Sequence, residues 1–306
     1  MDKSGCNGMN VINIDTIEQD RQSGSNAITK KTLECIKNRL SKELENSTEL
    51  EDIFDDLQSN VKRLLKKHIH MASLRKITNS FFLHFKRILN SDKDRSEILN
   101  LAITKIEQLE SDVLKNAKKI AQVGSRIIAN SNKIMTISNS SMVKELFLTA
   151  NAQKRKFEVF CLKSHPPDEG LEFAHSLADE GIETTIIADS AMGIFMPDIN
   201  LVLVGADRIY EDGFINKSGT FPLCAVAGYF NIPVYLVAET HKILLEIERS
   251  IRFNSEDSAE ICPSKNKNIS VRNVYFEKIP LDFIHKVICE DGVFEAHEFK
   301  KWYLEG

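Results

Sequence analysis

The sequence lacks the patterns that identify several common protein classes. None of its apolar runs approaches the roughly 18 consecutive residues that a membrane-spanning helix needs, so we expect no membrane association. Neither G-x-G-x-x-G nor G-x-x-x-x-G-K-[ST] occurs, which argues against a dinucleotide site and against a P-loop. The cysteines show no CxxC and no metal-type spacing, so we expect free thiols, no metal site and no cofactor. They are Cys6, Cys35, Cys161, Cys224, Cys262 and Cys289.

A large excess of charge of one sign is also missing. The chain has 40 Lys and Arg against 44 Asp and Glu, which gives a formal net charge of -4 and a pI near 6.1. Such a balance offers no overall attraction to a phosphate backbone, so we expect no direct nucleic-acid binding. Residues 1–15 carry neither the basic segment nor the apolar segment of a signal peptide, and we therefore expect a cytoplasmic protein.

Proline is missing from residues 27–122, and glycine is missing between Gly24 and Gly124. Apolar residues recur there at the i, i+3, i+4, i+7 spacing of amphipathic helices, for example from Leu50 to Leu65 and from Leu74 to Leu89. The pattern predicts an N-terminal helical domain of about four helices over residues 1–122.

Residues 123–306 show a different sequence pattern, with short apolar runs separated by turn residues. Helical stretches such as 142–152 and 171–180 alternate with these runs. This alternation predicts an α/β fold, a Rossmann-like parallel sheet with helices on both faces. The expected strands are 133–137, 157–162, 183–188, 201–205 and 233–238, and residues 254–268 are expected to form an exposed loop.

Ligands of open parallel sheets bind beyond the carboxyl ends of the strands, and polar clusters follow several strands here. The most specific cluster is 204–220, which reads as a strand, an acidic residue, a turn at Asp212-Gly213 and then Asn-Lys-x-Gly-Thr. Asp207 at a strand end is well placed for proton transfer, or it caps a turn. Asn216 and Lys217 are expected to open a helix and to bind an anion there, or to serve only as its structural start.

The Gly-Ala-Asp and Asn-Lys-x-Gly-Thr motifs resemble those of the initiation factor 2B α/β/δ subunit family. That superfamily also contains methylthioribose-1-phosphate isomerase and ribose-1,5-bisphosphate isomerase. The resemblance continues through Ala-Glu-Thr-His-Lys at 238–242 and through 273–294. It implies a helical N-terminal domain, a Rossmann-like C-terminal domain, and a homodimer or higher oligomer formed through the C-terminal domain. An apolar run at 221–229 is consistent with a buried helix at that interface.

The resemblance also implies roles for individual residues. Asp207 matches a catalytic Asp of the isomerases, and Ser138 stands where they have a catalytic Cys. The ligand-binding residues that it implies are Asn216, Lys217 and Lys242, with His165 and His68 in segments where the family has arginine. The phosphate-binding Arg-Gly-Ala loop of the isomerases is replaced by Ser-Gly-Ser at 23–25.

These replacements weaken the case for isomerase chemistry. A serine hydroxyl has a far higher pKa than a thiol and needs a strong base beside it to exchange protons. Histidine lacks the rigid two-donor fork with which arginine binds phosphate. The sequence therefore favours a non-catalytic regulatory or interaction subunit that binds a phosphorylated sugar or nucleotide, with a possible protein partner. The alternatives are an aldose–ketose isomerase acting on a ribose 1-phosphate derivative and a purely structural oligomerisation module.

Overall fold

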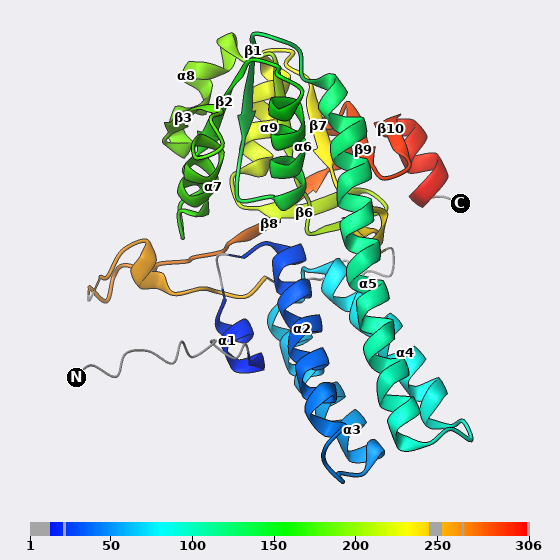
Figure 1. Cartoon of the computed structure of the whole chain (residues 1–306). Helices are drawn as coiled ribbons and strands as arrows, with labels where there is room; N and C mark the ends of the chain where they lie inside the picture. Colours follow the sequence, from blue (N-terminus) through cyan, green and yellow to red (C-terminus); the bar gives the residue numbers. More distant parts are fainter. Residues whose placement is uncertain (1–12, 21–22, 245–252, 265, 305–306) are drawn as a thin grey trace, which may run out of the picture.

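The computed structural model describes residues 13–20, 23–244, 253–264 and 266–304. A bundle of helices lies at one end of the molecule and a sheet covered by helices at the other, as Figure 1 shows. No helix in the described ranges is both long enough and apolar enough to cross a membrane. The fold class expected from the sequence is thus confirmed, with a helical N-terminal region followed by a mostly parallel sheet.

The bundle contains the four helices that the apolar spacing predicts. They are α2 (Ser25–Glu43), α3 (Leu50–Lys67), α4 (Ala72–Leu89) and α5 (Arg95–Gly124). Their apolar faces meet in one core that includes Ile36, Leu57, Phe81 and Phe85. The short helix α1 (Ile14–Gln19), which was not predicted, packs beside α2 and α3 and is capped by the Asn13 side chain.

The five predicted strands all form, and they lie in one seven-stranded sheet. They are β1 (Asn132–Thr136), β2 (Phe157–Leu162), β3 (Glu183–Ile187), β4 (Leu201–Val204) and β7 (Val234–Val237). The sheet is completed by β9 (Lys286–Cys289) and β10 (Gly292–Glu295), in the order β10-β9-β7-β4-β1-β2-β3. All neighbours are parallel except β9 and β10.

Helices cover both faces of this sheet. One face packs against α6 (Ser141–Ala152), α7 (Glu169–Ala178) and the last turns of α5. The other packs against α9 (Thr220–Tyr229), α8 (Met192–Phe195) and the C-terminal α10 (Ala296–Phe299), which runs on into a π-helical turn ending at Leu304. Strand β4 is buried on both sides, as its unbroken apolar sequence predicts.

A second, antiparallel sheet was missed by the sequence analysis. It pairs β5 (Arg208–Tyr210), β6 (Gly213–Lys217) and β8 (Phe276–Pro280). The predicted turn at Asp212-Gly213 is present as the β5–β6 hairpin. Asn216 and Lys217, however, end strand β6 and do not open a helix, because α9 begins at Thr220.

Helix α5 belongs to both regions. Ile98 and Ile106 lie in the bundle core, whereas Ala117 and Ile120 lie in the core under the sheet. Gly124 allows the close approach of its last turn, because a Cβ there would come within 2.4 Å of Leu146 Cδ1. The boundary predicted at residue 122 therefore falls inside the last turn of α5.

The predicted loop at 254–268 is mostly exposed where it is described, and it projects away from the body (orange in Figure 1). Its base is fixed by Glu260, which accepts hydrogen bonds from Asn273 and Tyr275. The described cysteines are free thiols, as expected, and three of them are buried in the sheet region; Cys6 lies outside the described residues.

Candidate functional site

The candidate site lies where the strand order reverses. The chain runs from β1 outward to β2 and β3, and then returns to place β4 on the other side of β1. The loops that leave β1 and β4 therefore diverge and open a crevice at their carboxyl ends. Ser138 follows β1 and Asp207 follows β4, so the reversal brings these two predicted residues to one place.

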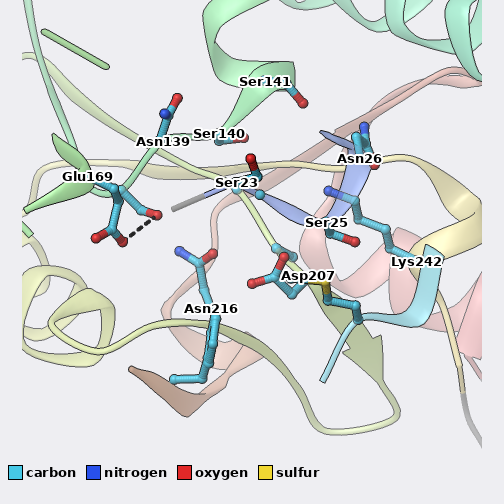
Figure 2. Close-up of a pocket in the computed structure, with 16 residues that line it drawn as sticks. Ser23, Ser25, Asn26, Asn139, Ser140, Ser141, Glu169, Asp207, Asn216 and Lys242 are labelled. Atoms are coloured by element: carbon cyan, nitrogen blue, oxygen red, sulfur yellow. Dashed lines mark hydrogen bonds between the residues drawn. The ribbon is translucent and has the colours of Figure 1, made fainter. Parts of the chain in front are cut away.

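A polar pocket occupies this crevice, with a volume of about 50 Å³. Two helix starts border the pocket. Residues 23–26 lead into the first turn of α2, and residues 138–141 lead into the first residue of α6. The wall also contains Asp207, Asn216, Lys242 and Glu169. Figure 2 shows Glu169 on one side, Lys242 on the other, and Asp207 and Asn216 between them. Four of the predicted site residues thus line one pocket, namely Ser138, Asp207, Asn216 and Lys242.

Asp207 is held by several elements. Its backbone N–H donates to the Ile215 carbonyl, and its own carbonyl accepts from the Ala72 N–H at the start of α4. Burial raises the pKa of its carboxyl to about 6, although Lys242, the Ser25 N–H and Lys217 act in the opposite direction. A carboxyl group with this pKa can both accept and release a proton near neutral pH.

Ser138 faces an acid that the sequence analysis did not single out. Its hydroxyl donates to Glu169 Oε1 at 3.1 Å, which is the dashed line in Figure 2. Its backbone adopts the left-handed conformation, with φ of 70°, and its N–H donates to Ser164 Oγ at 2.8 Å. The hydroxyl is therefore oriented towards a carboxylate, which accepts its hydrogen bond but is a weak base.

Lys217 is not free to bind an anion in this structure. Its ammonium lies 3.3 Å from Glu169 Oε2, donates to the Pro166 carbonyl and sits 4.4 Å from the centre of the Tyr275 ring. Burial lowers the pKa of Lys217 and raises that of Glu169, so both groups are shifted towards their neutral forms. Lys217 itself does not line the polar pocket, whereas its partner Glu169 does.

The start of α9, expected to hold a phosphate, is already occupied by a side chain. Glu277 Oε1 accepts hydrogen bonds from the Gly219 N–H at 2.7 Å and from the Phe221 N–H at 2.8 Å. A carboxylate in this position satisfies the first backbone donors of the helix and its partial positive charge. An anion would have to displace Glu277 to bind there.

Lys242 lines the pocket from the turn after β7 and is paired with Glu239. Its ammonium lies 3.4 Å from Glu239 Oε2, and the side chain of Glu239 is fully buried. Burial alone would raise the pKa of Glu239, but the charges of Lys242 and His241 outweigh it and the pKa lies below its usual value. Asn26 Nδ2 also donates to Glu239 Oε1, which ties α2 to the end of β7.

The two predicted histidines lie away from the pocket wall. The side chain of His165 is 46% exposed, and its Nδ1 lies 2.6 Å from Asp168 Oδ1. His68 is buried where α3 ends, and the backbone of Ile17 in α1 hydrogen-bonds its ring. His68 lines a small cavity in which three acids, Glu18, Asp20 and Glu256, outnumber the one lysine, Lys67, a setting that disfavours phosphate.

The formal charges around the pocket do not favour an anion. Three carboxylates, those of Asp207, Glu169 and Glu239, accompany only two ammonium groups, those of Lys217 and Lys242. The positive ends of α2 and α6 contribute about half a charge each, which brings the total close to zero. The arrangement suits hydroxyl-rich groups and proton transfer. In the described parts of the chain, no three His, Cys, Asp or Glu side chains could jointly hold a metal ion.

Sequence reasoning missed Glu169, Glu239, Glu277 and Asn26. The first two stand in segments already noted, Lys163–Gly170 and Ala238–Lys242, and a buried lysine needs a nearby carboxylate, which was the available signal. Glu277 and Asn26 lie far along the chain from their partners and could not be found from spacing.

Comparisons with known proteins identify the family of the chain and its relatives. A model of the initiation factor 2 subunit family matches residues 21–296. An eIF-2B subunit 2-like protein of Pyrococcus horikoshii is 29% identical over 279 residues, which cover 90% of this chain and 93% of the relative. Ribose 1,5-bisphosphate isomerase of Methanocaldococcus jannaschii is 29% identical over 225 residues, which cover 71% and 70%. The solved structure of the P. horikoshii translation initiation factor eIF-2B matches with a TM-score of 0.77 and 25% identity, over 92% of this chain and 95% of that one.

Proposed function

The chain belongs to the initiation factor 2 subunit family, and from this premise we propose that it is an initiation factor 2B-like subunit that binds a phosphorylated sugar or a nucleotide without converting it. The proposal makes it a regulatory or interaction subunit of a larger assembly. The sugar of the ligand occupies the polar pocket, where Asp207, Asn216 and Lys242 contact its hydroxyl groups.

The observation that supports this proposal is that a serine hydroxyl, that of Ser138, follows β1 and has Glu169 as its hydrogen-bonded base. The residue that follows β1 is an alcohol, and its hydroxyl donates to Glu169. Burial raises the pKa of Glu169, yet a carboxylate remains far too weak a base to deprotonate a serine hydroxyl near neutral pH. No thiol lies in the pocket wall among the described residues. The acid–base partner that Asp207 has in the isomerases is therefore replaced by a weaker group.

An incubation experiment tests the absence of turnover. The purified protein is mixed with ribose 1,5-bisphosphate or with methylthioribose 1-phosphate, and ketose formation is followed. We expect none, together with a ligand-induced rise in melting temperature, because a ligand that binds only the folded state stabilises it. A melting temperature unchanged by all sugar phosphates and nucleotides would favour a structural module.

Aldose–ketose isomerisation is the second candidate, and one observation favours it. Asp207, with a pKa of about 6, and Glu169, with a raised pKa, face the same pocket, the first from the segment between β4 and β5 and the second from the start of α7. Two such carboxyls could divide the acid and base roles. Wild-type turnover that disappears in Asp207→Asn would support this function, and Ser138→Cys would then test whether a thiol raises the rate.

We also propose that the protein forms a homodimer through the face around α9. Its apolar sequence was expected to be buried, yet Tyr229 is 81% exposed and Phe221 is 41% exposed. Ile194 on the adjoining α8 is 75% exposed. Large exposed apolar side chains on one face are typical of a protein interface. Light scattering should show a dimer at micromolar concentration, and Tyr229→Glu should yield a monomer.

A further inference from the structure

A second pocket adjoins the polar pocket and has the opposite character. It has a volume of about 350 Å³ and lies between α2, α5 and α6. We call it the apolar pocket, and its wall includes Ala27, Leu33, Val113, Leu114, Ala117 and Met142. Together the two pockets reach the range of about 300–1,000 Å³ that is usual for small-molecule sites.

The two pockets share two lining residues, Asn26 and Ser141. Asn26 is the second residue of α2 and Ser141 the first of α6, so the junction lies where the two helix starts meet. Figure 2 shows both side chains at the side of the polar pocket where Lys242 lies. A single ligand can therefore extend from the polar pocket into the apolar one.

The charges at the edge of the apolar pocket cancel. Lys30 and Lys118 are matched in number by Glu110 and Glu145. A charged group would gain nothing there and would lose hydration against the apolar wall. Leu114, at the edge, is 57% exposed, which leaves the pocket open to solvent.

The side chain of Asn26 indicates that the ligand carries a hydrogen-bond donor. Its Nδ2 is fixed by Glu239, and its buried Oδ1 accepts no hydrogen bond from any described residue. A buried carbonyl oxygen without a donor is destabilising, and an N–H group of a ligand would satisfy it. An alkyl chain fills the apolar pocket equally well but supplies no such donor.

From these observations we propose that the polar and apolar pockets form one site, and that the apolar pocket holds the base of a nucleoside or nucleotide. The sugar then lies in the polar pocket, where its hydroxyls donate to Asp207 and Glu169. The inference rests on the proposed ligand-binding function and narrows its ligand class, because a sugar phosphate without a base would leave the apolar pocket empty.

Titration calorimetry with three probes tests the proposal, using adenosine, adenosine 5′-monophosphate and ribose 5-phosphate. We expect both adenine compounds to bind at least about tenfold more tightly than ribose 5-phosphate. Val113→Phe, which fills the apolar pocket, should weaken adenosine binding about tenfold or more and leave ribose 5-phosphate binding unchanged. Leu83→Phe, at an exposed site on α4 outside both pockets, is the matched control. Melting curves of each variant confirm folding.

Each other outcome has a defined meaning. Ribose 5-phosphate binding as tightly as adenosine, or Val113→Phe acting equally on both, would overturn the inference while leaving the proposed function intact. Binding of none of the three probes would overturn both. A change in oligomeric state caused by Val113→Phe, seen by light scattering in the same samples, would identify the apolar pocket as a contact between copies of the chain and would also overturn the inference.

Discussion

Two carboxylate–lysine pairs flank the polar pocket, and their geometry is nearly the same. Glu169 and Lys217 are separated by 3.3 Å, Glu239 and Lys242 by 3.4 Å, and all four side chains are at least nine-tenths buried. The pKa of Glu169 is nevertheless raised, chiefly by burial, whereas that of Glu239 is lowered because its charged and hydrogen-bonding neighbours outweigh burial.

The difference lies in the other groups that each carboxylate contacts. Glu239 has Asn26 as a fixed donor and the ring of His241 at 3.9 Å in addition to its lysine. Glu169 has the Ser138 hydroxyl and a lysine whose own pKa is lowered by burial. The separation of a buried pair therefore does not decide its ionisation, because the other charged and polar groups around each carboxylate also shift its pKa. The Glu239 side of the pocket is therefore fixed, and the Glu169 side can change protonation.

The largest expected effect is the removal of Glu239. Glu239→Ala would leave Lys242 buried without its carboxylate, and we expect a loss of about 3–5 kcal/mol in the free energy of unfolding. Urea denaturation measures it. The control is Lys286→Ala, which breaks the exposed pair with Glu295 and should cost less than about 1 kcal/mol. Equal costs for the two variants would mean that Glu239 is not ionised in the folded protein.

The pH dependence of stability tests Asp207. Its pKa is about 6 in the folded state and near 3.8 when unfolded, so between these values the folded state binds more protons. Stability contributed by this group is therefore greatest at low pH and falls as pH rises from 4 to 6, by about 2 kcal/mol. Asp207→Asn should remove this decline. A decline of the same size in the variant would assign it to other groups.

Replacing Lys217 should have a smaller effect than replacing Glu239. In Lys217→Met the apolar stem is retained and Glu169 can take up a proton, since its pKa is already raised. We expect a loss of about 1–2 kcal/mol at pH 7 that shrinks at pH 5. Denaturation at the two pH values measures it. A loss as large as that of Glu239→Ala would show that both pairs are equally fixed, which contradicts the comparison.

The smallest effect concerns Ser138. Ser138→Ala removes the hydrogen bond to Glu169 and should cost about 1 kcal/mol. Ser138→Gly loses the same bond but relieves the left-handed conformation, so it should cost less than the alanine variant. Thermal unfolding of both variants decides this, and a glycine variant that is the less stable one would refute the role assigned to the backbone.

The sequence predicted the elements whose signal is local. The 3.6-residue spacing located α2 to α5, and the apolar runs located β1, β2, β3, β4 and β7. The small sheet was missed because β5 and β6 together span only residues 208–217 and their partner β8 lies some 60 positions later. Asn216 and Lys217 were therefore assigned to a helix start when in fact they pair with Glu277 and Phe276 in a ladder.

The candidate site was predictable only in part. Strand ends located Ser138, Asp207 and Lys242, because parallel strands bring their carboxyl ends to one edge. The groups that pair with them depend on tertiary contacts: Asn26 reaches Glu239 across more than 200 positions, and Glu277 occupies the helix start expected to bind phosphate. Whether Ser138, His165 and His68 act on a ligand stays a prediction.

The shared helix α5 has a consequence for exchanging parts between relatives. In a chimera with its junction at residue 122, Ala117 and Ile120 would come from a different parent than the sheet against which they pack. In one with its junction before Arg95, Ile98 and Ile106 would come from a different parent than the rest of the bundle core. A crossover that keeps each half with its own core falls between Val113 and Ala117. Recombinants made there would inherit the bundle from one parent, the sheet from the other, and a hybrid wall of the apolar pocket from both.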